Sequence, residues 1–184
     1  MEILFERDGF FYSIRKILMQ NNVQISLKIA INLVIDETSN KILMIQEAKD
    51  HSRGLWFLPA GKGKEGETII ETCVRETEEE GGLLTEPIYL LKTEHIVRKI
   101  VMNEGEEMKP LDIFKFIFVS RSLNKELKTF ENKDSIQAKW FTIDEIKELP
   151  LRSIEVLNYI ELFQNHKNNK SLLKIDEILE VYHD

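Results

Sequence analysis

The stretch GKGKEGETIIETCVRETEEEGGL, residues 61–83, decides how the rest of the chain is interpreted. Its glycines and lysines are typical of a loop, and the residues after them have helical character. Thr68 and Glu71, three residues apart, form a capping box, which predicts that a helix begins there. Gly81 and Gly82 predict where that helix ends. The segment is therefore expected to be a loop, a helix and a second turn.

Three glutamates of the predicted helix, Glu76, Glu79 and Glu80, share one flank, because successive helical residues are about 100° apart. Like charges at this spacing repel each other, and the helix macrodipole disfavours anions near the C-terminus. A bound cation would offset both costs, and ligands that are all oxygens favour Mg²⁺ or Mn²⁺. The alternative is a solvated acidic face, which is what most charge runs are. The helix by itself leaves both interpretations open.

The whole segment resembles the box that defines the Nudix hydrolase family. In that box a glycine, a glutamate, an Arg-Glu pair, a Glu-Glu pair, a second glycine and an apolar residue stand at set spacing. The single departure is Thr77, where an aliphatic residue is more usual. The likeness continues at lower specificity over about residues 24–165. The positions that match the box are Gly61, Glu67, Arg75, Glu76, Glu79, Glu80, Gly82 and Leu83.

This resemblance implies a divalent metal site that serves hydrolysis, with Mg²⁺ as the expected cofactor and Mn²⁺ as the alternative. Glu67 and Arg75 would form a pair that orients the ligands. Glu79 or Glu80 would also accept or relay a proton. Gly61 and Gly82 would serve backbone geometry. The ligands implied are three carboxylates and one backbone carbonyl: Glu76, Glu79, Glu80, and the carbonyl of Ala60 or Gly61.

Members of the family often use a further carboxylate from outside the box as a general base. Glu131 is the preferred candidate here, with Asp134 as the second, because both precede a predicted strand that contains Trp140. An acidic loop supplies rival candidates, namely Glu104, Glu106 and Glu107.

Three residues are candidates for binding the substrate. Lys62 would contact phosphate, while Phe57 and Trp140 would stack on a base. The alternatives are a solvated lysine and aromatic residues that belong to the core. Cys73, on the apolar side of the predicted helix, is interpreted as a core residue rather than a nucleophile.

The remaining chain mixes strands and helices, which predicts an α/β protein of the mixed α+β kind. We expect the Nudix fold, a mixed β-sheet sandwiched between helices. The predicted domains are an N-terminal helical extension over 1–22 and a Nudix domain over 23–184 that ends in helices. The expected loop is 60–66, the strands are 24–35, 41–46, 87–92, 94–102, 111–120 and 136–142, and the later helices are 142–150, 151–164 and 171–182.

Composition limits the partners. The chain has 184 residues, a net charge of −7 and one cysteine. An acidic surface disfavours wide contact with a nucleic acid polymer, and no apolar run is long enough to cross a membrane. We therefore expect a cytoplasmic enzyme that binds a small nucleotide, and homodimer formation is left open.

Residues outside the box indicate which nucleotide is the substrate. The run over 54–62, and Trp140-Phe141 followed by Leu151-Arg152, are similar to the Nudix branch that hydrolyses oxidised guanine nucleotides such as 8-oxo-dGDP. Hydrolysis of ADP-ribose, a dinucleoside polyphosphate or a sugar nucleotide is the alternative. A Nudix-fold nucleotide-binding module without catalysis is a third hypothesis.

Overall fold

The computed structural model describes residues 25–100, 109–124, 126–127, 131–167 and 173–174. The predicted extension over 1–22, the rival loop with Glu104, Glu106 and Glu107, and most of the predicted helix over 171–182 lie outside these residues. The described residues form two compact units. One contains residues 25–27, 94–100 and 109–114, and the other contains the rest. The candidate site lies wholly within the second unit.

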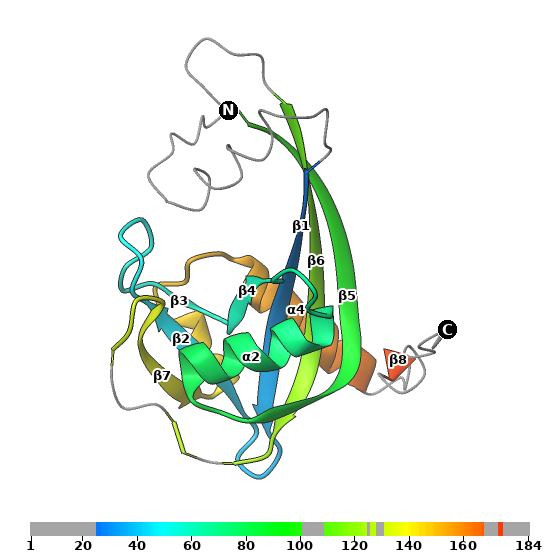
Figure 1. Cartoon of the computed structure of the whole chain (residues 1–184). Helices are drawn as coiled ribbons and strands as arrows, with labels where there is room; N and C mark the ends of the chain where they lie inside the picture. The colour runs from blue at the N-terminus through cyan, green and yellow to red at the C-terminus, as the bar shows by residue number, and fades with distance from the viewer. Residues whose placement is uncertain (1–24, 101–108, 125, 128–130, 168–172, 175–184) are drawn as a thin grey trace. The chain divides into compact units, whose positions relative to one another are not determined.

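Eight strands of the described chain form one sheet in the order β3-β2-β1-β6-β5-β8, with β4 paired to β1 and β7 paired to β2. The strands predicted over 24–35 and 41–46 correspond to β1 and β2, which are antiparallel with Ile35 opposite Ile42. Figure 1 shows this arrangement. The strands are β1 (Ile25–Asp36), β2 (Lys41–Glu47), β3 (Trp56–Phe57), β4 (Ala60–Lys62), β5 (Thr85–Ile100), β6 (Lys109–Ser122), β7 (Ser135–Phe141) and β8 (Leu173–Lys174).

Three sequence-based assignments are wrong in detail. The first three residues of the predicted loop over 60–66 form strand β4, because their backbone pairs with β1 at Ala30↔Gly61. The segments 87–92 and 94–102 were expected as two strands, but β5 runs unbroken to Ile100. Residues 173–174 of the last predicted helix are strand β8, which pairs with β5. The corrections at β4 and β8 arise from pairing with a strand distant in sequence, which local composition does not contain.

Helices cover both faces of the sheet, as expected. Alternate residues of β1 point to opposite faces. Ala30 belongs to one core cluster with Cys73 of α2 (Ile69–Gly81), whereas Ile31 belongs to another cluster with Ile146 of α3 (Ile143–Lys147) and Val156 of α4 (Glu155–Lys167). In Figure 1, α2 lies in front of the sheet and α4 lies behind it. No helix in the described part of the chain is both long and apolar enough to span a membrane.

A buried polar contact explains why Thr77 departs from the usual aliphatic residue. Asn32 of β1, only 1% exposed, donates from Nδ2 to Thr77 Oγ1 at 2.8 Å and accepts from Ser120 Oγ at 2.6 Å. Thr77 also donates to the Cys73 carbonyl at 2.8 Å. Because a buried amide needs partners, Thr77 complements Asn32 and fixes α2 against the sheet.

This contact predicts a coupled pair of substitutions. Asn32→Ala and Thr77→Val should each lower the free energy of unfolding by about 1–3 kcal/mol, since each leaves a buried polar group without its partner. The double variant should lose about 1 kcal/mol less than the sum. Urea denaturation measures this coupling. Thr77→Val combined with Lys147→Ala, an exposed residue of α3, should be additive. Additive losses for Asn32 and Thr77 would show that the contact contributes nothing.

Candidate functional site

Helix α2 carries the three glutamates, and both of its ends are fixed. Thr68 is the N-cap, and the capping box with Glu71 is present as predicted. Gly82 ends the helix with a left-handed φ of 76°, and its N–H donates to the carbonyl of Glu78. This conformation favours glycine. The sequence therefore predicts this element well, because its signals are local.

The loop before β7 and the first residue of β7 hold the C-terminal turn of α2. Asn132 Nδ2 donates to the carbonyl of Glu79 at 3.0 Å, and Ser135 Oγ donates to the carbonyl of Glu80 at 2.8 Å. The last carbonyls of a helix have no intrahelical hydrogen-bond donor, and these two side chains donate to two of them. The backbone of two glutamates in the predicted ligand set is thereby fixed. Neither residue could be identified from the sequence, because nothing local marks a side chain that caps a distant helix.

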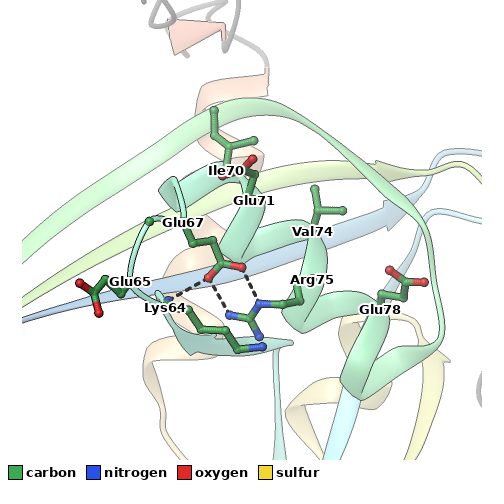
Figure 2. A pocket seen from close by; sticks show the side chains of 9 residues that line it. Lys64, Glu65, Glu67, Ile70, Glu71, Val74, Arg75 and Glu78 are labelled. Atoms are coloured by element: carbon green, nitrogen blue, oxygen red, sulfur yellow. Dashed lines mark hydrogen bonds and ion pairs between the residues drawn. The ribbon is translucent and has the colours of Figure 1, made fainter.

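Glu67 and Arg75 form the expected pair, and the contact is bidentate. Arg75 Nε donates to Glu67 Oε1 at 2.6 Å, and Nη2 donates to Oε2 at 2.9 Å. Figure 2 shows the Glu67 carboxylate between Arg75 and the backbone of Lys64, whose N–H donates to it at 2.9 Å. The guanidinium holds the pKa of Glu67 down at about 2. This half-buried ion pair ties the loop to the first turns of α2.

Arg75 extends the pair toward the helix carboxylates. Its Nη1 donates to Glu76 Oε1 at 2.6 Å and to Glu79 Oε2 at 3.1 Å. Lys64 Nζ also lies 3.3 Å from Glu79 Oε1. The cations therefore fix where two of the three carboxylates lie and reduce the repulsion between them.

Two of the glutamates converge on the backbone of Ala60 and Gly61. A Cβ atom on Gly61 would lie 1.9 Å from Cδ of Glu76, so the Glu76 carboxylate packs directly against this glycine. Glu80 accepts a hydrogen bond from the Ala60 N–H at 3.0 Å. Two of the three carboxylates that the sequence predicts as ligands, those of Glu76 and Glu80, therefore lie against the backbone of Ala60 and Gly61.

The Glu80 carboxyl is almost completely buried, with 4% of the residue exposed. Burial raises its pKa to about 8. The Ala60 N–H and the ammonium of Lys49 lower this pKa, whereas the nearby carboxylates of Glu47 and Glu76 raise it. A carboxylate placed here without a bound cation is destabilising, which fits a group that binds metal.

This shift predicts how stability depends on pH in metal-free protein. Between the usual Glu pKa of 4.5 and the folded value of about 8, the folded chain keeps a proton that the unfolded chain loses. The free energy of unfolding should therefore fall as pH rises through this window. Urea denaturation in EDTA from pH 5 to pH 8 measures it. Glu80→Gln should lose this component, and an identical pH profile in that variant would contradict the assignment. Mg²⁺ should stabilise the wild type more at pH 8 than at pH 6, because it binds the deprotonated form.

The donor set fits a hard divalent cation, because its side chains are all carboxylates and two of them, Glu76 and Glu80, lie against the backbone of Ala60 and Gly61. In the described residues, no three His, Cys, Asp or Glu side chains are already grouped closely enough to hold a metal ion. The reason lies in the contacts above, since Glu76 and Glu79 are turned to Arg75 and Glu80 is turned to the Ala60 N–H.

The two candidate bases outside the box are placed differently. Glu131 forms an ion pair with Arg53 at 2.7 Å, and both side chains are about half exposed. Asp134 lies 3.5 Å from Lys49 and is close enough to Glu76 to contribute to its raised pKa, whose largest cause is burial. Asp134 therefore lies in the electrostatic environment of the carboxylates, and the role of Glu131 as a base stays a prediction.

The predicted substrate residues separate into surface and core. Lys62 is exposed on β4, and Trp140 is half-buried against the core on the α2 face. The expectation that Phe57 stacks on a base is corrected: its ring is 2% exposed, and the Arg152 guanidinium lies 3.8 Å over it. Cys73 is buried in the core, and burial raises the pKa of its thiol far above the usual range. The core interpretation of Cys73 is therefore confirmed.

A shallow pocket of about 610 Å³ lies on the side of α2 that Figure 2 shows. It shares Glu67 and Arg75 with the candidate site, but Glu76, Glu80 and Gly61 do not line it. Ile70 and Val74 are the apolar side chains that line it. The pocket therefore belongs to the outer surface of the box and not to the place where the carboxylates converge.

Comparison with known proteins gives a consistent result. Residues 26–160 match the family described as the NUDIX domain. The chain is 39% identical over 125 residues to "8-oxo-dGDP phosphatase NUDT18" of Mus musculus, which is 67% of this chain and 34% of that protein. It is 37% identical over 130 residues to the Homo sapiens protein of the same name, which is 70% of this chain and 36% of that protein. The chain thus spans about a third of the length of these curated relatives.

A solved structure, "NUDIX hydrolase from Nitrosomonas europaea", matches with a TM-score of 0.65 at 23% identity. The match covers 85% of this chain and 97% of that one. At this identity the likeness shows the fold and no more. It confirms the sheet between helices that the sequence predicted.

Proposed function

This chain belongs to the NUDIX domain family, and from that premise we propose that it is a hydrolase that uses a divalent metal ion to cleave the diphosphate of a nucleoside diphosphate. The observation that carries the proposal is the convergence of Glu76 and Glu80 on Ala60 and Gly61, next to a bidentate pair of Glu67 and Arg75. A binding module without catalysis has no need of this complete set.

The chain's own residues divide the work. Glu76, Glu79 and Glu80, with the carbonyl of Gly61 or Ala60, would hold the metal, and Mg²⁺ is the ion we propose. When bound, the ion would offset charge on the phosphate oxygens and lower the pKa of a bound water. Arg75, fixed by Glu67, positions the carboxylates that it contacts. A carboxylate accepts the proton of the attacking water.

We propose an oxidised guanine nucleotide as the substrate, with 8-oxo-dGDP converted to 8-oxo-dGMP and phosphate. The support is the 37–39% identity to two proteins named 8-oxo-dGDP phosphatase over 125–130 residues. The residues of the candidate site from Ala60 to Asp134 all fall inside the span 26–160 that matches the family. The cytoplasmic location and the homodimer stay predictions from sequence.

A product assay with Mg²⁺ tests this substrate. The panel is 8-oxo-dGDP, 8-oxo-dGTP, dGDP, ADP-ribose and a dinucleoside tetraphosphate. We expect the highest kcat/KM for 8-oxo-dGDP, with monophosphate and phosphate as products. Preference for ADP-ribose or for the dinucleotide would keep the metal chemistry and refute the substrate. Absence of turnover for every compound, with Mg²⁺ bound, would favour a binding module.

A further inference from the structure

An arginine outside the box is held in a fixed position next to the core aromatic residues. Backbone hydrogen bonds join residues 150–152 to β3: Trp56 N donates to the Pro150 carbonyl, and Arg152 N donates to the Trp56 carbonyl, each at 2.9 Å. The Arg152 guanidinium lies 3.8 Å over the Phe57 ring. A long side chain placed this way has lost much of its conformational freedom before any ligand binds.

A buried glutamate holds the same guanidinium in place. Arg152 Nη1 donates to Glu47 Oε1 at 2.5 Å, and the two side chains are 34% and 6% exposed. The pair is formally neutral, which lowers its attraction for a phosphate. An arginine bound to a carboxylate and stacked on a ring still has one planar face and several N–H donors.

The pair lies next to the helix that carries the predicted metal ligands. Glu47, the last residue of β2, is opposite Ser135 of β7. Ser135 in turn donates to the carbonyl of Glu80 at 2.8 Å. Two short contacts therefore connect the Arg152 pair to the carboxylate site, within one compact unit.

We propose that Arg152 is the surface on which the base of the nucleotide stacks, and that Glu47 positions it. This inference rests on the proposed function and names the residue that contacts the base. Guanidinium planes stack on nucleobases as aromatic rings do. Phe57 does not contact the base itself but supports Arg152 from below, so that ring, guanidinium and base would form one stack. Because the ion pair of Arg152 and Glu47 is formally neutral, it favours the base over the phosphate as the group that is bound.

Equilibrium binding of products tests the inference without requiring turnover. Calorimetry with Mg²⁺ would measure the affinity of the full chain for 8-oxo-dGMP and for deoxyribose 5-phosphate, which lacks a base. Arg152→Ala should weaken 8-oxo-dGMP binding about tenfold or more, in the range that base stacking contributes. It should leave deoxyribose 5-phosphate unchanged. Arg152→Lys, which keeps the charge without the plane, should resemble Arg152→Ala.

Several outcomes would overturn the inference. Equal loss for both probes would make Arg152 a phosphate ligand, and full binding in Arg152→Lys would indicate a role for charge alone. Unchanged binding of 8-oxo-dGMP in Arg152→Ala, or no binding to the wild type, would also contradict it. The turnover panel decides separately on the proposed function, so the two failures are distinguishable.

Arg152→Ala leaves Glu47 buried and unpaired, which can destabilise the fold, so a second variant is needed. Arg152→Met with Glu47→Gln keeps an apolar cover on Phe57 and removes the buried charge. We expect it to fold, as followed by its Tm, and to show the same selective loss of 8-oxo-dGMP binding. Wild-type affinity for 8-oxo-dGMP in this folded variant would refute the stacking role.

Discussion

Glu79→Gln is expected to lower kcat by about 100- to 10,000-fold and to leave the fold intact. The change removes a negative charge from the metal-binding set and a group that handles protons, and a positioned acid or base contributes an effect of this size. The side chain is 43% exposed and its ion pairs with Arg75 and Lys64 lie near the surface, so the cost to stability is small. Steady-state kinetics with saturating Mg²⁺ measure the loss.

Glu78→Gln is the matched control for this substitution. Glu78 precedes Glu79 on α2, is exposed and lines the outer pocket rather than the carboxylate site. It undergoes the same chemical change, so its kcat should stay within about twofold of the wild-type value, as expected of a surface substitution away from the site. Full activity in Glu79→Gln, or an equal loss in both variants, would refute the assignment of Glu79.

Gly61→Ala is expected to abolish most activity through a single methyl group. The new Cβ would lie 1.9 Å from Glu76 Cδ and 2.2 Å from Glu76 Oε1, well inside any contact distance. The Glu76 carboxylate would have to leave its position, and the loss of a metal ligand should reduce both metal affinity and kcat. Disturbing a group that only orients the metal ligands lowers metal affinity or activity by about 10- to 100-fold. Displacing Glu76, a predicted ligand itself, should lower kcat by more than this.

Gly63→Ala, two residues after Gly61 and just beyond β4, is the control. Its Cβ would meet Thr72 Oγ1 at 3.2 Å, which requires a shift of only a few tenths of an ångström. We expect near-normal kinetics for this variant. If Gly61→Ala retained wild-type kcat and Mg²⁺ dependence, Glu76 could not act from the position described here. The Tm of both variants separates loss of the site from loss of the fold.

The carboxylate helix could be predicted from sequence because its signals are local. Thr68, Glu71 and Gly82 specify the caps, and the spacing of the glutamates specifies a shared flank. The role of Gly61 could be predicted only in part. A role in backbone geometry was expected for Gly61, but the left-handed conformation occurs at Gly82 and not at Gly61. A glycine is required at position 61 because any side chain there would collide with the Glu76 carboxylate.

Contacts between distant segments could not be predicted from sequence. Arg152 and Glu47 are 105 residues apart, and no local signal indicates that they form a pair. Their pairing depends on β3, which brings Trp56 beside Leu151. The same limit applies to Phe57, because its aromatic character gave no sign that an arginine would cover its ring. Thr77 is similar, since Asn32 is its partner only in the folded sheet.

Binding of Mn²⁺, followed by electron paramagnetic resonance, tests the central claim most directly, because it needs neither a substrate nor turnover. The carboxylates of α2 should give the wild type and Glu78→Gln a saturable Mn²⁺ site that Mg²⁺ displaces. Glu79→Gln should bind Mn²⁺ at least about tenfold more weakly. Equal Mn²⁺ affinity in the wild type and Glu79→Gln, or no saturable site in the wild type, would contradict the metal site on which the proposed hydrolysis depends.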